Sequence, residues 1–160
     1  MKVLIVSDTH GRNGNFYQVL TQEKDLGLII HLGDIDSLEG NIEKASGVPC
    51  YAVKGNNDYY SSLPSESVIM LGSHRTFITH GHNFGVSYTN ANLRHYAEGL
   101  DCDYALYGHT HFPEIEKYGR LTLVNPGSLT YPRQPGRKPS YCVAMVNDDG
   151  SVDFEIKYLD

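Results

Sequence analysis

The chain has 160 residues, of which 40% are hydrophobic and 20% charged, and this ordinary globular composition excludes intrinsic disorder, collagen-like repeats and long coiled coils. The 19 acidic residues outnumber the 13 basic ones and give a net charge of −6, which argues against a dedicated nucleic-acid-binding surface and against binding to anionic membranes. The length predicts a single domain that spans residues 1–160.

The three cysteines, Cys50, Cys102 and Cys142, form no CxxC pair, which excludes a disulfide framework and a zinc ribbon. Free thiols suit a reducing compartment, and residues 1–10 hold too few apolar residues for a signal peptide. No segment approaches the roughly 20 apolar residues of a membrane span. We therefore expect a cytoplasmic protein without a membrane partner.

Short apolar runs, each followed by Gly, Asp, Asn or His, recur along the chain. Uninterrupted runs of this length are typical of strands that are buried on both faces. They occupy residues 3–6, 28–30, 51–53, 76–79 and 104–107.

Segments with helical periodicity lie between the first runs and after the fourth. They cover residues 15–24, 37–46 and 90–100, with Ser37 and Asn90 as candidate N-caps of the second and third. The resulting β-α-β-α-β order of the first half predicts parallel strands joined by crossover helices.

The second half of the chain favours antiparallel pairing. Residues 68–79 read as a hairpin, and further strands are predicted at 121–124, 141–146 and 152–158. Residues 148–150 have the composition of a turn between the last two strands. The fold class predicted from these elements is α/β with mixed sheets.

Side chains that bind divalent metals follow five of the apolar runs. Because ligand sites form at the carboxyl ends of strands in open α/β sheets, we expect these residues to converge on one edge. Mixed nitrogen and oxygen donors without thiolate permit Mn, Fe, Ni, Co or Zn. The candidate ligands are Asp8, His10, Asp34, Asn56, His80, His109 and His111.

Each motif alone is weak evidence for a metal. Asp8 can cap a turn, and a Gly-Asp pair such as 33–34 is ordinary turn chemistry. The clustered histidines at 80–82 and 109–111 are more demanding, because folding alone rarely requires them. The ordered combination of all five motifs favours a metal centre, whereas His31 and the cysteines are interpreted as packed residues.

The motifs, taken in order, resemble those of the calcineurin-like metallophosphoesterases. They are DTH at 8–10, GD at 33–34, GNND at 55–58, THGH at 79–82 and GHTH at 108–111. NPGS at 125–128, followed by Pro132 and Arg133, looks like the small YfcE-type phosphodiesterase branch. The resemblance implies a four-layer α/β/β/α sandwich with a dinuclear metal site at its edge.

The resemblance also implies a role for each candidate ligand. The first metal would be held by Asp8, His10 and His111, the second by Asn56, His80 and His109, and Asp34 would bridge both. Two divalent ions, with Mn as the first choice, would lower the pKa of a bridging water. The resulting hydroxide would attack the phosphorus of a small phosphodiester or phosphoester substrate.

The chain departs from the superfamily at Asn57, where a histidine usually assists the leaving group. An amide can hydrogen-bond to phosphate but cannot deliver a proton at neutral pH. Asp58, the acid that follows, then lacks its usual imidazole partner. His82 and Arg133 complete the candidates: Asn57, Asp58 and His82 for catalysis, and Asn57, His82 and Arg133 for substrate binding.

Other functions are compatible with parts of this pattern. A eukaryotic retromer scaffold subunit resembles the same family, so a non-catalytic protein-interaction scaffold is the main alternative. Every expected ligand is present here, and keeping clustered carboxylates and imidazoles without a metal would destabilise the fold. A hydrolase of the metallo-β-lactamase type would carry HxHxDH, which is absent. The oligomeric state stays open, with a homodimer among the options.

Overall fold

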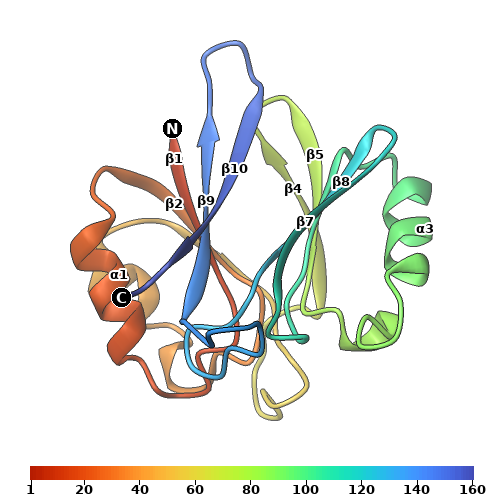
Figure 1. Cartoon of the computed structure of the whole chain (residues 1–160). Helices are drawn as coiled ribbons and strands as arrows, with labels where there is room; N and C mark the ends of the chain where they lie inside the picture. The colour runs from red at the N-terminus through yellow and green to blue at the C-terminus, as the bar shows by residue number, and fades with distance from the viewer.

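The computed structural model describes all residues 1–160 and contains two β-sheets with helices on their outer faces (Figure 1). The first sheet comprises β1 (Lys2–Val6), β2 (Leu26–His31), β3 (Cys50–Ala52), β9 (Ser140–Val146) and β10 (Val152–Tyr158). The second comprises β4 (Glu66–Leu71), β5 (His74–Thr79), β6 (Tyr104–Leu106), β7 (Pro113–Tyr118) and β8 (Leu121–Pro126). The helices are α1 (Gly14–Gln22), α2 (Ile42–Ser46) and α3 (Ala91–Gly99), with 3₁₀ turns η1 (Asp36–Leu38) and η2 (His82–Phe84).

Both sheets are mixed. The strand order is β10-β9-β1-β2-β3 in the first sheet and β4-β5-β6-β8-β7 in the second. β1, β2 and β3 run parallel, and β9 is antiparallel to β1. β5, β6 and β8 also run parallel, while the edge strands β4 and β7 are antiparallel to their neighbours. The parallel β1-β2-β3 order confirms the predicted crossover arrangement.

Three apolar cores join four layers. Val3 and Ile5 point from β1 into the core between the sheets, whereas Leu4 and Val6 point into a second core beneath α1 and α2. A third core lies between the second sheet and α3, which contributes Leu93. This arrangement confirms the predicted α/β/β/α sandwich. It also explains the uninterrupted apolar run of β1, because both faces of that strand are covered.

Two elements differ from the prediction. The helix predicted over 37–46 is divided into η1 and α2, because Gly40 lies between them with φ 71°, a left-handed conformation that ends a helical turn. β7 was not predicted, because it contains no uninterrupted apolar run. Its first residue is Pro113, and charged residues are interspersed along it. That composition is typical of an edge strand, and β7 lies at the edge of its sheet.

Neither predicted helix cap forms. Ser37 lies within η1, and α2 begins after Asn41. Asn90 makes no capping bond, and its side-chain amide donates instead to Glu116 Oε2 at 2.9 Å. Asn90 therefore ties the start of α3 to β7 instead of capping the helix.

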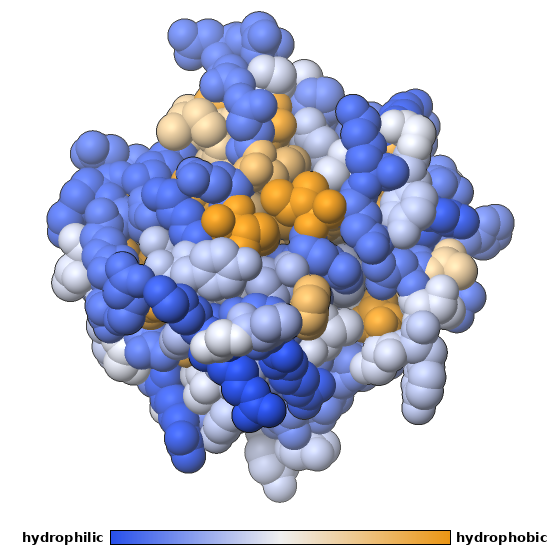
Figure 2. All heavy atoms as spheres, viewed as in Figure 1, coloured by the Kyte–Doolittle hydropathy of each residue, from blue (hydrophilic) through white to orange (hydrophobic).

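The face of the molecule in Figure 2 is mainly hydrophilic, with a small group of apolar side chains near its centre, in the region of β7 and β10. Ile115 of β7 is among the exposed apolar residues. None of the helices has the length and apolar composition needed to cross a bilayer.

Candidate metal centre

The candidate ligands lie at the carboxyl ends of five strands, β1, β2, β3, β5 and β6, in the loops at the lower edge of the two sheets in Figure 1. Since three of these strands are parallel in one sheet and two in the other, their loops meet at this edge. The convergence expected from the sequence therefore occurs.

Five of the seven candidate ligands adopt left-handed backbone conformations. The φ angles are 56° at Asp8, 47° at His10, 51° at Asp34, 68° at His109 and 58° at His111. Few residues tolerate this region, and Asp and His are among those enriched there. The chain turns sharply at these positions directly after each strand, and the turn brings the side chains together at the cost of local strain.

Two motif glycines allow the loops to approach closely. A Cβ at Gly55 would lie 2.1 Å from Asp34 Oδ1, and one at Gly108 would lie 2.0 Å from Ser7 Oγ. Neither position requires a left-handed φ. Glycine is needed at both for space, because any side chain there would collide with a group that touches the donor cluster.

The first donor set consists of Asp8, His10 and His111. Asp8 Oδ1 lies 3.0 Å from His111 Nε2 and 3.5 Å from His10 Nε2, and the two Nε2 atoms are 3.4 Å apart. One donor atom from each residue thus faces a common point. This mixed carboxylate and imidazole set suits a borderline divalent cation.

The second donor set adjoins the first. Its members Asp8, Asp34 and His80 again bring one donor atom each to a common point. Asp34 Oδ2 lies 3.5 Å from His80 Nε2 and 3.6 Å from His10 Nε2, so it faces one histidine of each set. Asn56 Oδ1 extends the second set, at 3.1 Å from the same His80 nitrogen.

Backbone carbonyls orient two of the histidines. Leu32 O lies 2.7 Å from His80 Nδ1, and Tyr131 O lies 2.8 Å from His111 Nδ1. A carbonyl only accepts hydrogen bonds, so the Nδ1 atoms carry the protons in these contacts. The Nε2 atoms face the carboxylates and are available as metal donors in the neutral rings.

Asp8 gives the strongest sign that the cluster is built for a cation. Its Oδ2 accepts hydrogen bonds from Ser7 Oγ at 2.6 Å and from the His109 backbone N–H at 3.1 Å. Its Oδ1 is buried and has no hydrogen-bond partner. A buried carboxylate oxygen without a donor is costly, and a bound divalent cation would satisfy it. The donors present fit such an ion.

The electrostatics of the cluster keep both carboxylates ionised. Burial opposes ionisation of Asp8, but the neighbouring imidazoles of His10, His111 and His80 outweigh this effect and hold the pKa of Asp8 well below its ordinary value. Burial also opposes ionisation of Asp34, yet interactions with His80 and Asn57 lower its pKa to about 2. The neighbouring carboxylate of Asp8 raises the pKa of His10. Two carboxylates thus attract positive charge to one spot, whether as protons or as metal ions.

His109 and His82 lie on the side of the second set. The His80 ring centroid is 5.2 Å from that of His109 and 5.4 Å from that of His82. Burial lowers the pKa of both His109 and His82, which favours their neutral forms. His82 Nδ1 is buried without a partner. Both rings are thus placed beside the cluster, where the sequence predicted them.

Asn57 and Asp58 have different surroundings. Asn57 donates its backbone N–H to Asp34 Oδ1 at 2.9 Å and its side-chain amide to Asp34 Oδ2 at 2.7 Å. Asp58 instead accepts the backbone N–H groups of Gly55 at 2.7 Å and of Ile35 and Asp36 at 3.0 Å each. These contacts do not fit a direct catalytic role for Asp58. They fit a residue that fixes two ligand-bearing loops.

Arg133 and His31 complete the sequence candidates. Arg133 is exposed at the rim of the first set, where its backbone N–H donates to His111 O at 3.0 Å. His31 is fully buried, 3.1 Å from Thr9 Oγ1, and burial lowers its pKa to about 4. This burial confirms that His31 is a packed, neutral residue.

The structural role of the NPGS segment was not predicted from the sequence. Asn125 Nδ2 donates to Gly108 O at 3.0 Å and to Thr110 Oγ1 at 2.9 Å, and Ser128 Oγ donates to Asp8 O at 2.9 Å. Both residues are fully buried. The segment therefore holds two ligand loops in place, and a polar motif directly after an apolar run is the signal that could have revealed it.

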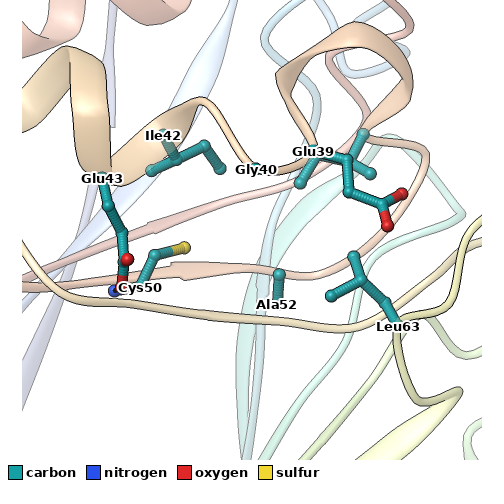
Figure 3. A pocket seen from close by; sticks show the side chains of 8 residues that line it. Glu39, Gly40, Ile42, Glu43, Cys50, Ala52 and Leu63 are labelled. Carbon is teal, nitrogen blue, oxygen red and sulfur yellow. Dashed lines mark hydrogen bonds between the residues drawn. The ribbon is translucent and has the colours of Figure 1, made fainter.

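A separate cavity of about 210 Å³ lies between α2 and β3 (Figure 3). Glu39 and Glu43 line it and would repel an anionic substrate. Burial raises the pKa of its Cys50 thiol to about 12, so that thiol is a poor nucleophile. The cavity contains no candidate ligand.

A helix-flanked pair of mixed sheets with clustered carboxylates and imidazoles at one edge is typical of metal-dependent hydrolases. The family model of the calcineurin-like phosphoesterase superfamily domain matches residues 1–149, and the chain belongs to this superfamily. It is therefore one of the metal-dependent hydrolases of phosphoric esters.

Similar proteins agree with this assignment. The probable metallophosphoesterase YsnB of Bacillus subtilis is 32% identical over 155 residues, which cover 95% of this chain and 88% of YsnB. Phosphodiesterase YfcE of Escherichia coli is 36% identical over 109 residues, 63% of this chain and 54% of YfcE. The resemblance to the YfcE-type branch is thus confirmed.

Solved structures share the fold. A conserved protein of Streptococcus pneumoniae, described as a predicted phosphoesterase, has a TM-score of 0.80 at 29% identity and covers 96% of this chain and 87% of its own. Vps29 of Entamoeba histolytica in complex with zinc has a TM-score of 0.78 at 26% identity and covers 99% of both chains.

Proposed function

We propose that this chain is a dinuclear metal-dependent phosphodiesterase. The observation that supports the proposal most is the pair of adjoining donor sets, in which the buried Asp8 Oδ1 lacks any hydrogen-bond partner. Asp8, His10 and His111 would hold one cation and Asn56, His80 and His109 the other. When bound, the cations would supply an activated water as the nucleophile and neutralise charge on the phosphoryl group.

Asp34 is the proposed bridging ligand. Its Oδ2 lies within 3.6 Å of a histidine nitrogen of each set, and its pKa of about 2 keeps it anionic at neutral pH. Mn²⁺ is the proposed ion, although the mixed donors also suit Ni, Fe, Co or Zn. Metal analysis of Asp34→Asn should find the loss of both ions, whereas His111→Ala should lose chiefly one.

The groups beside the cations would orient the ester. Asn57 is held against Asp34, and His82 has a buried nitrogen without a partner, so both can hydrogen-bond to phosphoryl oxygens. The Asn57 amide cannot transfer a proton to the leaving oxygen at neutral pH. This supports small phosphodiesters with good leaving groups as the preferred substrates.

The test uses metal-stripped protein, bis(p-nitrophenyl) phosphate and p-nitrophenyl phosphate. Hydrolysis should require added Mn²⁺, and the diester should be the better substrate. Asp34→Asn should lower kcat/KM at least about 100-fold, because it removes the charge of a ligand shared by both ions. Asp101→Asn, a change at an exposed side-chain carboxylate that pairs with Arg120, is the matched control. Full turnover by the metal-free protein would overturn the mechanism.

A protein-interaction scaffold is the second candidate. The nearly complete structural likeness to Vps29 favours it, since the whole fold is shared. The two candidates differ in activity toward esters: a scaffold would bind a cation without measurable hydrolysis of either nitrophenyl ester.

A further inference from the structure

An open cavity of about 510 Å³ lies beside the first donor set, within the loop that follows β8. Its lining consists of Thr130, Tyr131, Pro132, Arg133 and Arg137. The loop contacts the metal centre directly: Tyr131 O accepts from His111 Nδ1 at 2.8 Å, and Arg133 N–H donates to His111 O at 3.0 Å. A group bound in this cavity would therefore adjoin the first donor set.

Three arginines lie at or near the cavity. Arg133 and Arg137 line it, and the guanidinium carbon of Arg12 lies 5.2 Å from the centre of the Tyr131 ring. No ion pair of the structure uses any of these three arginines. In a chain with a net charge of −6, they form a local positive site at the mouth of the metal centre. Figure 2 shows strongly hydrophilic side chains over the loops at the lower centre of this face.

The loop is fixed in its shape. Gln134 is buried, its side-chain amide donates to Lys138 O at 2.6 Å, and its backbone carbonyl accepts the Arg137 N–H at 2.9 Å. Arg137 has φ 46°, a left-handed conformation that an arginine rarely adopts. Such strain persists only where surrounding contacts impose it, and it clusters at ligand-binding sites.

Tyr131 holds the remaining arginine. Tyr131 is 44% exposed, and the centroid of its ring lies 5.3 Å from that of His10. A guanidinium above a tyrosine face is attracted by the ring, so Arg12 is oriented toward the same region as the two loop arginines. Lys138, in contrast, is paired with Asp160 at 2.9 Å and is not free to take part.

We propose that this cavity binds a second, non-reacting phosphate of the substrate. The inference rests on the proposed function and narrows its substrate class to small phosphodiesters that carry another phosphate close to the scissile one. Guanidinium groups match phosphate geometry by paired hydrogen bonds, and a diester without the extra phosphate would leave the arginines unused.

The probes are thymidine dinucleotides with and without a 5′-phosphate, tested as competitive inhibitors of bis(p-nitrophenyl) phosphate hydrolysis by the Mn-loaded protein. The phosphorylated dinucleotide should have an inhibition constant about 10-fold lower, because it alone makes charge-assisted hydrogen bonds to the arginines. Arg137→Gln should bring the ratio of the two constants close to one, and added salt should reduce it. Arg120→Gln, which removes an arginine paired with Asp101 and Asp103, should leave the ratio unchanged.

Equal inhibition by the two dinucleotides in the wild type would overturn the second-phosphate site while leaving the proposed function intact. A ratio that survives Arg137→Gln would also overturn it. If the nitrophenyl diester is not hydrolysed at all, the proposed function fails. The dissociation constants of the two dinucleotides, measured by calorimetry, then test the second-phosphate site independently. Equal constants would overturn it.

Discussion

Gly55→Ala is the smallest change that should displace a candidate ligand without removing it. The φ of Gly55 lies outside the left-handed region, so alanine fits the backbone and the only obstacle is space. An ideal Cβ would lie 2.1 Å from Asp34 Oδ1 and 2.4 Å from the backbone nitrogen of Asp34.

The size of the effect follows from these distances. Ordinary contact begins at 3.4 Å, so the Asp34 carboxylate would have to retreat by about 1.3 Å and its backbone nitrogen by about 1.0 Å. Side-chain rotation cannot relieve the backbone contact. Overpacking costs about 1–3 kcal/mol of stability, and a displacement of about 1 Å at a catalytic site costs about 100-fold in rate. We expect losses of this size in Gly55→Ala.

The assay combines kcat/KM for bis(p-nitrophenyl) phosphate with the Tm measured with and without Mn²⁺. Gly99→Ala is the control, because a Cβ there meets nothing within 4 Å at the end of α3. It should keep full activity and gain up to about 1 kcal/mol of stability. A folded Gly55→Ala protein with wild-type kcat/KM and a wild-type response to Mn²⁺ would refute the steric reasoning.

Three other predictions concern the metal, acid stability and the leaving group. Saturating Mn²⁺ at about 100 times its dissociation constant should stabilise the fold by about 2.7 kcal/mol in calorimetry, and an unchanged Tm would contradict a preformed site. Burial opposes ionisation of Glu23, but hydrogen bonds from Lys2 and Lys157 lower its pKa from 4.5 to about 2. The ionised Glu23 therefore contributes up to about 3 kcal/mol to the free energy of unfolding above pH 4.5, and this stabilisation is lost as the pH falls toward 2. In Glu23→Gln, the free energy of unfolding measured with denaturant should depend less on pH between pH 4.5 and 2. A pH dependence equal to that of the wild type would show that the contacts of Glu23 with the two lysines do not stabilise the fold. Finally, the rate should fall steeply with leaving-group pKa in the wild type and less steeply in Asn57→His, since general acid catalysis is worth about 10²–10⁴-fold. Equal slopes, with chemistry rate-limiting, would mean that another group already supplies the proton.

The convergence of the candidate ligands at one edge of the sheets was the most predictable feature of the chain. Asp8 and Asp34 follow runs that are apolar without interruption, and such runs predict parallel strands buried on both faces. Parallel strands end at the same edge, so the sequence order of the motifs translates directly into proximity. The layers follow for the same reason, since a strand that is apolar on both faces must have a layer on each side.

Contacts between distant loops were not predictable. The GNND motif does not show that the Asp58 carboxylate accepts hydrogen bonds from the backbone N–H groups of Ile35 and Asp36, because these bonds depend on how two loops pack. The bond from Asn125 to Gly108 O is hidden for the same reason. β7 was not predicted because it is an edge strand, and an edge strand does not need an uninterrupted apolar run.

The left-handed backbone at Asp8, His10, Asp34, His109 and His111 also limits how this centre can change during evolution. Asparagine and glycine tolerate such conformations, so drift toward them can abolish cation binding while the chain still folds. Valine or isoleucine at the same positions would meet a severe backbone penalty and threaten the whole sandwich. Descendants of this fold that abandon ester hydrolysis should therefore carry mainly asparagine, glycine or another small polar residue at the old ligand positions.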